Sequence, residues 1–421
     1  MTSAPDAPEH GFRLSQLIYD TRYRSLTIQV VVLFLVMAGA AWLVDNTIRN
    51  LNVLGKDFNF GFLSNRAGYD IAQYLIPYSN DSTHGRAMLV GLLNTLWISV
   101  LGCITATAIG IVVGVLRLSP NWLVSRLMTI YVETFRNIPL LLWILVAIAM
   151  LTEAAPAPNA YKINPATGTA NASMILFDSV AFTNRYTAIP SGDFARSLGV
   201  LDTPLAPISL DWLAVLVVLG LSIWAKRRFT HWADAVQEKT GKRPKTWWGS
   251  ILIVLLPVAL LLGALGFSMH EPELKGFNFV GGTNVSNSFV ALWAGLSLYT
   301  GAFIAEIVRA GIMAVSRGQS EAAFALGLRP ARTMSLVILP QALRVIVPPL
   351  ISQFLNLTKN SSLAIAVGYM DLRGTLGGIT LNQTGRELEC ILLMMLIYLA
   401  ISLAISGAMN LYNKSVRLKE R

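Results

Sequence analysis

Four consecutive polar residues interrupt an apolar segment in the C-terminal part of this chain and are the first candidates for chemistry: Lys359, Asn360, Ser361 and Ser362. Lys359 follows Arg344 by fifteen residues, or about 22 Å along a helix, which places it deep in an apolar layer. A charge at mid-bilayer costs about 2.5–3.5 kcal/mol on insertion scales, so such residues face other helices or a water-filled path. Two interpretations stand: these residues line the route of a polar solute, or they form hydrogen bonds between helices.

Two pairs of opposite charge have the spacing of one helix face. Glu306 and Arg309 are three residues apart near the end of an apolar segment, and Glu133 and Arg136 have the same spacing near Pro139. Residues three apart are neighbours on a helix surface. Each pair is therefore predicted to form a structural ion pair, with a direct role in transport as the alternative.

Smaller polar residues in other apolar segments are weaker candidates for the same polar route: Asn94, Thr95, Tyr299 and Thr300. Side chains of this kind often serve only to hold helices together through hydrogen bonds. That bonding role is the alternative at these four positions.

Motifs for catalysis or for a cofactor are missing from the sequence. The Gly-Lys pairs at 55–56 and 241–242 lack the glycine five positions earlier that a phosphate-binding loop requires. The two cysteines, Cys103 and Cys390, and the four scattered histidines form no metal-ligand cluster, and no nucleophile, base and carboxylate set is apparent. We expect no enzyme activity, no cofactor and no metal, so any energy must come from a partner.

The composition requires apolar surroundings for most of the chain. Of 421 residues, 54% are hydrophobic and 13% are charged, against about 25% charged in a soluble chain, and the mean hydropathy is +0.56. The net charge of +10 comes from 33 Lys and Arg against 23 Asp and Glu. These basic residues are distributed between apolar segments rather than gathered in one patch, so a nucleic-acid partner is not expected.

Crossing a bilayer takes a helix of about 20 mainly apolar residues, and the chain has eight such segments. The predicted fold is an all-α polytopic membrane bundle with spans at Thr27–Val44, Met88–Leu116, Trp122–Leu151, Asp211–Trp224, Trp248–Met269, Phe289–Val315, Val345–Met370 and Cys390–Leu411. Pro139 is expected to break or kink the third span, because proline lacks the backbone donor.

The orientation follows from the basic residues, which stay on the cytoplasmic side near span ends. Seven of them lie in the connection between the fourth and fifth spans: Lys226, Arg227, Arg228, Lys239, Lys242, Arg243 and Lys245. This connection is predicted to be cytoplasmic. We favour a topology anchor in contact with anionic lipid as its role, with a specific binding site as the alternative. Both termini then also lie inside, and residues 45–87 and 152–210 lie outside.

The outer segment 152–210 is rich in Ala, Pro, Asn, Thr and Ser and has no helical periodicity. It is predicted to be a loop-rich cap with little regular structure. Two roles remain open for it, contact with a partner or a solvated insertion.

Between the sixth and seventh spans, the predicted cytoplasmic segment has the signals of a helical hairpin. Ser320 is predicted to cap a short helix that begins at Glu321, and alanines at 322, 323 and 325 keep that helix slim. Gly327 is expected to end it, and Pro330 suits the first turn of a second helix toward Pro340. The small-residue face of the first helix is suited to close approach by another protein.

This hairpin resembles the cytoplasmic EAA loop of ABC importer permease subunits. The matching residues are Glu321, Ala322, Ala323, Gly327, Leu339 and Pro340, with Val337 where the family usually has isoleucine. The likeness continues in LSLYTGAFIAEIVRAGI, LNLTKNSSLAIAVGYMDL, GLLNTLWISVLG and FRNIPLLLW, which resemble the subfamily that imports polar amino acids. It covers roughly residues 91–151 and 296–372, and the added segments resemble the longer permeases for general L-amino acids or for glutamate, glutamine, aspartate and asparagine.

The resemblance implies a type I importer permease fold and a bacterial inner-membrane location. It divides the chain into a leader (1–26), a first span and outer segment (27–87), a first core half (88–151), an outer insertion (152–210), two extra spans (211–288), a second core half (289–412) with its coupling loop (316–344), and a tail (413–421). The six matching hairpin residues would contact the ATPase.

The implied partners are a pair of ABC ATPase subunits, a periplasmic amino-acid-binding protein and a second permease subunit. That second permease is either another copy of the chain or, as we favour, a related chain. An ion- or proton-coupled secondary transporter is the alternative function, because it would also have many spans and buried charges. Such a transporter has no need for a docking hairpin.

Overall fold

The computed structural model describes residues 18, 21–53, 55, 57–163, 168–203 and 206–416. Most of the predicted leader and the last five residues of the predicted tail lie outside the described residues. Two compact units divide the chain, residues 1–61 and 62–421. The first unit contributes helix α2 (Thr21–Val53), whose apolar side chains are exposed along its length.

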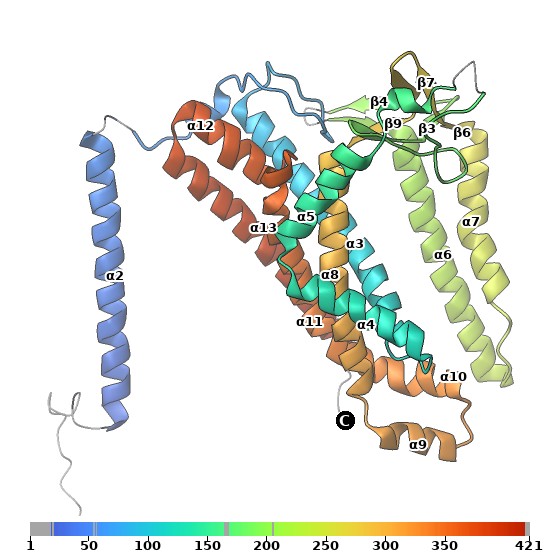
Figure 1. Ribbon diagram of the computed structural model, residues 1–421. Coiled ribbons are helices and arrows are strands. Elements are labelled where there is room, and N and C mark those ends of the chain that lie inside the picture. Colours follow the sequence, from blue (N-terminus) through green and yellow to red (C-terminus); the bar gives the residue numbers. More distant parts are fainter. Residues whose placement is uncertain are drawn as a thin grey trace, which may run out of the picture. The chain divides into compact units, whose positions relative to one another are not determined.

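Helices make up the body of the second unit (Figure 1). The longer helices are α3 (His84–Leu116), α4 (Trp122–Asn137), α5 (Leu140–Ala149), α6 (Leu210–Thr240), α7 (Trp247–Ala264), α8 (Asn287–Met313), α9 (Arg317–Ala325), α11 (Leu339–Asn360) and α13 (Glu387–Val416). The short helices are α10 (Pro330–Thr333) and α12 (Leu381–Thr384). Single turns and π-helical or 3-10 segments complete the unit: η1 (Gly61–Ser64), η2 (Met150–Ala154), η3 (Pro158–Tyr161), η4 (Met334–Ile338), η5 (Ser361–Val367) and η6 (Arg373–Thr380).

Capping residues set where several of these helices begin. The side chains of Thr83, Asn121 and Ser286 accept hydrogen bonds from the first backbone N–H groups of α3, α4 and α8. At Pro139 the chain bends by 105° between α4 and α5, which confirms the predicted break in the third span.

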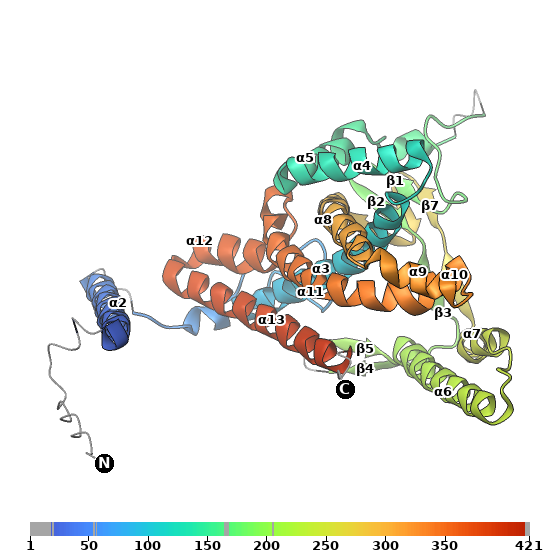
Figure 2. The same cartoon turned by 90° about the horizontal axis from the view of Figure 1, so that it is seen from below.

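The core forms where α8 packs against α3, with α4–α5 on one side and α11 on another (Figure 2). Fully buried Ile98, Leu292, Leu296 and Ile304 belong to this core. Glycines allow the two backbones to approach. A Cβ atom at Gly110 would lie 2.5 Å from Ile304 Cγ2, and one at Gly114 would lie 2.7 Å from the backbone oxygen of Ala305. In lipid, where apolar burial drives helices together weakly, this close packing holds the pair.

By length and composition, six described helices could cross a membrane, and the bent α4–α5 pair makes up to seven. This is close to the predicted eight. The difference lies at α6, which is a 31-residue helix whose apolar part is bounded by Asp211 and Lys226. The fifth span also ends earlier than predicted, because α7 ends at Ala264 and Phe267–His270 forms strand β6.

A small β unit lies at one end of the helices (Figure 1), and it corrects the prediction that residues 152–210 have little regular structure. Its strands come from two segments on either side of the α6–α7 pair: β1 (Ala181–Phe182), β2 (Tyr186–Ile189), β3 (Ser191–Phe194), β4 (Val200–Asp202), β5 (Pro207–Ser209), β6 (Phe267–His270), β7 (Pro272–Lys275), β8 (Asn278–Gly281) and β9 (Thr283–Ser286).

Antiparallel pairing joins those two segments. Strands β1, β2 and β9 form one sheet, β3 pairs with β6, and β4–β5 and β7–β8 are separate pairs. In the joining register, Ile189 is opposite Thr283 and Gly192 is opposite Met269. Strands of two to four residues whose partners lie beyond two helices leave no periodic pattern in the sequence.

The glycine contact yields a stability prediction. Replacing Gly114 with alanine would place a methyl group within 2.8 Å of both the Ala305 oxygen and Val308 Cβ. We expect the protein to lose about 1–3 kcal/mol of stability, as in overpacked cores. Thermal unfolding in detergent, followed by tryptophan fluorescence, measures the change.

Gly220 in α6 provides the control, because nothing lies within 4 Å of its Cβ position. The Gly220→Ala variant should unfold at the wild-type temperature or slightly above it, since alanine favours the helix. Equal melting of the two variants would show that α3 and α8 do not pack tightly at Gly114.

Candidate functional site

The predicted helical hairpin exists at the end of the bundle opposite the β unit (Figure 1). Its first arm is α9, which begins at Arg317 after an N-cap at Ser316. The prediction that Ser320 caps a helix beginning at Glu321 is wrong, since Ser316 already has the extended backbone and Gln319 N–H bonds its carbonyl oxygen at 3.1 Å. Ser320 and Glu321 therefore lie inside the helix.

Gly327 ends this first arm, as its φ of 76° permits. The backbone N–H of Leu328 bonds the Ala323 oxygen at 3.1 Å, which closes the helix end. Pro330 then occupies the first turn of α10, as predicted. From Pro330 the chain stays helical through η4 and α11 as far as Asn360.

The hairpin presents exposed apolar side chains between the membrane-spanning candidates α8 and α11. Leu326 is 81% exposed and Phe324 is 50% exposed, whereas Ala323 is buried against the second arm. The other predicted contact residues, Glu321, Ala322, Gly327, Leu339 and Pro340, are exposed. Sequence reasoning missed Phe324 and Leu326, although apolar residues beside a glycine C-cap in a polar loop are a recognisable signal.

An ion network joins three helices above the hairpin. Glu306 of α8 accepts hydrogen bonds from Arg309, at 2.6 Å, and from Arg117 at the end of α3. Arg117 also lies 3.8 Å from Glu133 of α4, and its side chain is only 9% exposed. The predicted Glu306–Arg309 pair is thus present, and Arg117 is the residue that the sequence did not single out.

The second predicted pair does not form. Glu133 is directed to Arg117 instead of Arg136. The Arg136 guanidinium lies 5.3 Å from the centroid of the Phe303 ring, and its Nε is buried with no hydrogen-bond partner among the described residues. Partners on α3 and α8 have displaced the local i, i+3 contact, which is worth only a few tenths of a kcal/mol.

The four consecutive polar residues at the end of α11 differ in their exposure. The Lys359 side chain is exposed on this chain and has no ion-pair partner among the described residues. Ser361 is fully buried and its hydroxyl donates to the Thr358 oxygen at 2.8 Å. Asn360 and Ser362 are half-buried. Lys359 alone of the four is therefore fully open to a partner or a path.

Asn94 and Thr95 connect α3 to the chain after η5. The Asn94 amide donates to the oxygens of Gln73 and Met370, both at 2.9 Å. The Thr95 hydroxyl accepts from Leu372 N–H at 3.0 Å. Both residues are buried, and this geometry supports the bonding interpretation over the solute route.

The other two candidates lie within α8, where Thr300 is buried and Tyr299 packs on Phe303 with 5.0 Å between ring centroids.

One buried polar residue, Asp371, was not predicted from the sequence. Asp371 is fully buried and accepts hydrogen bonds from Gly374 N–H at 2.8 Å and from the Tyr398 hydroxyl at 3.3 Å. It fixes the connection between η5 and η6.

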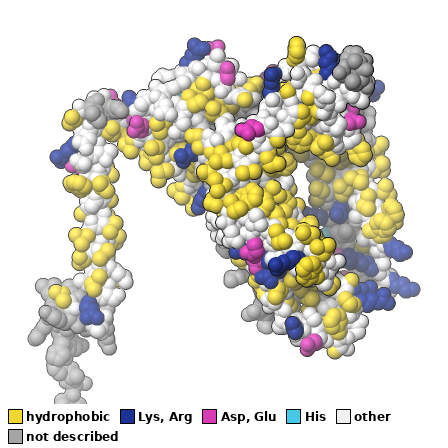
Figure 3. All heavy atoms as spheres, in the orientation of Figure 1, with side chains coloured by type: hydrophobic (Ala, Val, Ile, Leu, Met, Phe, Trp, Pro, Cys, Tyr) yellow, Lys and Arg dark blue, Asp and Glu magenta, His cyan; other side chains and the backbone are white. Residues whose placement is uncertain are grey.

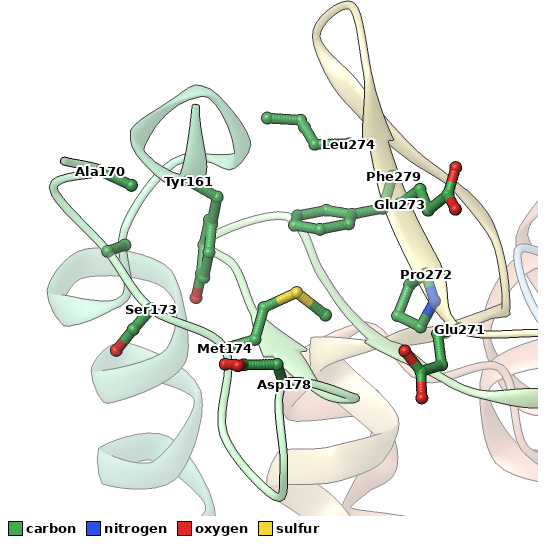
Figure 4. Close-up of a pocket in the computed structure, with 11 residues that line it drawn as sticks. Tyr161, Ala170, Ser173, Met174, Asp178, Glu271, Pro272, Glu273, Leu274 and Phe279 are labelled. Atoms are coloured by element: carbon green, nitrogen blue, oxygen red, sulfur yellow. The ribbon is translucent and has the colours of Figure 1, made fainter. Parts of the chain in front are cut away.

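The β unit has an open pocket of about 510 Å³. Figure 4 shows the rings of Tyr161 and Phe279 side by side, in an edge-to-face contact with ring centroids 5.4 Å apart, and Asp178, Glu271 and Glu273 also line the pocket. The Tyr161 hydroxyl donates to the Phe182 oxygen at 2.6 Å, and burial raises the pKa of this hydroxyl.

Comparisons with a family model and with individual proteins all lead to transport-system permeases. Residues 106–418 match the model of binding-protein-dependent transport system inner membrane components. The chain is similar to the glutamate/glutamine/aspartate/asparagine transport system permease protein BztB of Rhodobacter capsulatus, at 65% identity over 100% of both chains. It is also similar to the general L-amino acid transport system permease protein AapQ of Rhizobium johnstonii, at 41% identity over 98% of this chain and 96% of that one.

A third similar protein is the putative amino-acid ABC transporter permease protein YhdX of Escherichia coli. Its identity is 42% over 94% of this chain and 95% of that one. All three likenesses therefore include the extra segments at 152–288 as well as the core.

The ion network predicts that Arg117 holds three helices together. Replacing Arg117 with methionine removes one of the two cations that neutralise Glu306 and the cation nearest Glu133. Because Glu306 keeps Arg309, we expect a moderate loss of stability, about 1–3 kcal/mol. Thermal unfolding of the purified protein measures it.

Arg126 of α4 is the matched control, since its side chain is exposed and it forms no ion pair among the described residues. The Arg126→Met variant should unfold within a degree or two of wild type. If Arg117→Met were equally harmless, the network would not stabilise the bundle.

Proposed function

The chain belongs to the family of binding-protein-dependent transport system inner membrane components, and from that membership we propose that it forms the membrane path of an ATP-driven importer of polar L-amino acids. The amino-acid substrate class rests on the names of the similar permeases. Family membership disfavours the ion-coupled alternative. The protein is a multi-pass membrane protein, and we place it in the bacterial inner membrane.

The observation that carries the proposal is the exposed hairpin and its continuity with α11. Leu326 and Phe324 are displayed outside the apolar spans, as expected for a surface that another protein covers. From Pro330 to Asn360 the chain is helical without a break. This helical stretch is about 46 Å long and acts as a lever. A partner that moves α9 would thereby move the segment that carries Lys359.

The ATPase partner follows from the lack of a phosphate-binding loop in this sequence. We propose that a pair of ABC ATPase subunits binds the hairpin through Glu321, Ala322, Ala323 and Gly327 together with Phe324 and Leu326. Closure of the ATPase pair on ATP then pulls the hairpins together and switches the path between its two openings.

A second permease subunit completes the path. Lys359 carries a charge at membrane depth, is exposed on this chain and has no ion-pair partner among the described residues, a state that is costly against lipid. We propose that a related permease, or a second copy of this chain, covers that face and that the Lys359 ammonium and Asn360 amide meet the amino acid there. On the outside, a periplasmic binding protein delivers the substrate.

The docking assignment is tested at Gly327. The Gly327→Asp variant adds a bulky anion at the end of α9, and we expect the ATPase to be lost on purification and ATP-driven uptake to fall at least tenfold. Mass spectrometry of the tagged complex and uptake into vesicles measure the two effects.

Gly276, in the turn between β7 and β8, is a matched control because its φ of 69° imposes the same left-handed strain and nothing lies within 4 Å of its Cβ position. The Gly276→Asp variant should retain both the ATPase and uptake. Normal uptake by Gly327→Asp would refute the coupling role of the hairpin.

The path assignment is tested at Lys359. The Lys359→Met variant should keep its ATPase subunits and its basal ATP hydrolysis but lose most uptake, because an amino-acid carboxylate loses its cationic partner. Lys359→Arg, which keeps the charge, should retain a larger share of uptake. Unchanged rate and affinity in the methionine variant would exclude Lys359 from the path.

A further inference from the structure

The cytoplasmic end of the α6–α7 pair concentrates positive charge. Residues 226–246 include seven Lys and Arg against two acids, Asp234 and Glu238. All seven cations are exposed. Only Arg243 has a carboxylate partner among the described residues, Asp234 at 2.8 Å. Figure 3 shows these Lys and Arg side chains gathered at the lower end of the pair.

Aromatic rings lie at the same level as the cations. Phe229 of α6 contacts the backbone of α7 at Gly249, where a Cβ atom would lie 2.8 Å from the ring. The first turn of α7, with Trp247 and Trp248, therefore lies beside the turn of α6 that follows Lys226 and Arg227. The two indoles stack on one another, with ring centroids 3.9 Å apart.

Exposed indoles level with cations are the arrangement found at membrane–water interfaces. Trp224, Trp232, Trp247 and Trp248 are each 54–61% exposed. Lys226 directly follows the apolar part of α6, and Lys245 is two residues before α7 begins. Their side chains can therefore reach headgroup phosphates while their stems remain against apolar surface.

The surfaces on the membrane side of this charge also face outward. In α7 no residue is buried in this chain, and most of its apolar side chains are exposed. A continuous apolar surface next to a cluster of indoles and cations matches a phospholipid, with acyl chains along α7 and an anionic headgroup at the cations. A protein that bound only the cations would not need the adjoining apolar surface of α7.

We propose that this end of the α6–α7 pair is a binding site for anionic phospholipid, with headgroup phosphates held by Lys226, Arg227 and Lys245 beside the indoles of Trp247 and Trp248. Each cation near an anionic surface strengthens binding roughly fivefold. Loss of three cations should therefore weaken it on the order of 100-fold. The site is independent of the substrate and of the ATPase.

The test uses the whole transporter complex in nanodiscs of equal phosphatidylglycerol and phosphatidylcholine. Native mass spectrometry measures the ratio of the two lipids retained on the complex. Wild type should retain an excess of phosphatidylglycerol, and the triple variant K226Q/R227Q/K245Q should lose most of that excess. The control variant R185Q/R196Q/K275Q removes the same amount of charge from the β unit, away from the site, and should retain the excess of phosphatidylglycerol.

Two further variants show whether reduced lipid retention comes from the loss of charge or from misfolding. The charge-preserving K226R/R227K/K245R should retain the lipid as wild type does, and W247L/W248L should reduce retention several-fold with the charge intact. Unchanged retention in K226Q/R227Q/K245Q would overturn the proposal. Loss of the ATPase from that variant with its lipid retained would also overturn it, because the cations would then contact protein.

Discussion

Close backbone packing between α3 and α8 is the constraint on which the other parts of this bundle depend. Gly110 and Gly114 leave room for Ile304, Ala305 and Val308, so at these two positions α3 contributes no side chain and α8 packs directly on its backbone. Lipid offers these helices no hydrophobic reason to associate, and dense packing must supply the attraction. This contact also brings Arg117, at the end of α3, within reach of Glu306. Packing and charge pairing therefore reinforce each other at one interface.

The same interface determines what can move. Arg117 ties α3, α4 and α8 together, while the second arm of the hairpin, from Pro330, and α11 form one helical path outside this network. The ion network and this helical path thus involve different elements, and the two meet where α11 packs against α8. An importer that changes between two openings needs such a division, since packed cores switch between discrete arrangements and do not deform gradually.

Sequence reasoning located most of the spans, the Pro139 break, the hairpin and its Gly327 end. Each of these has a local signal: hydropathy, a residue without a backbone donor, or a glycine that permits a left-handed conformation. It missed Arg117, and it paired Glu133 with the wrong arginine, because the true partners come from helices distant in sequence. The strands at 181–209 were invisible for the same reason. Strands β2 and β3 have their pairing partners at 267–286, and β1, β4 and β5 are only two or three residues long, so none of them carries an alternation that a short stretch of sequence would reveal.

The register between β2 and β9 has a consequence for how the chain is assembled. Ile189 and Thr283 are opposite one another, so residues 190–282 leave the fold and return to it at adjacent points. The α6–α7 pair and the strands β3–β8 thus form a module inserted at one point of the chain, and Ala206 of this module also packs against the cluster around Ile71 and Ile76. Such a module can be inserted or removed without changing the order of the core helices. Its apolar helices can therefore acquire a different function while the transport path is unchanged.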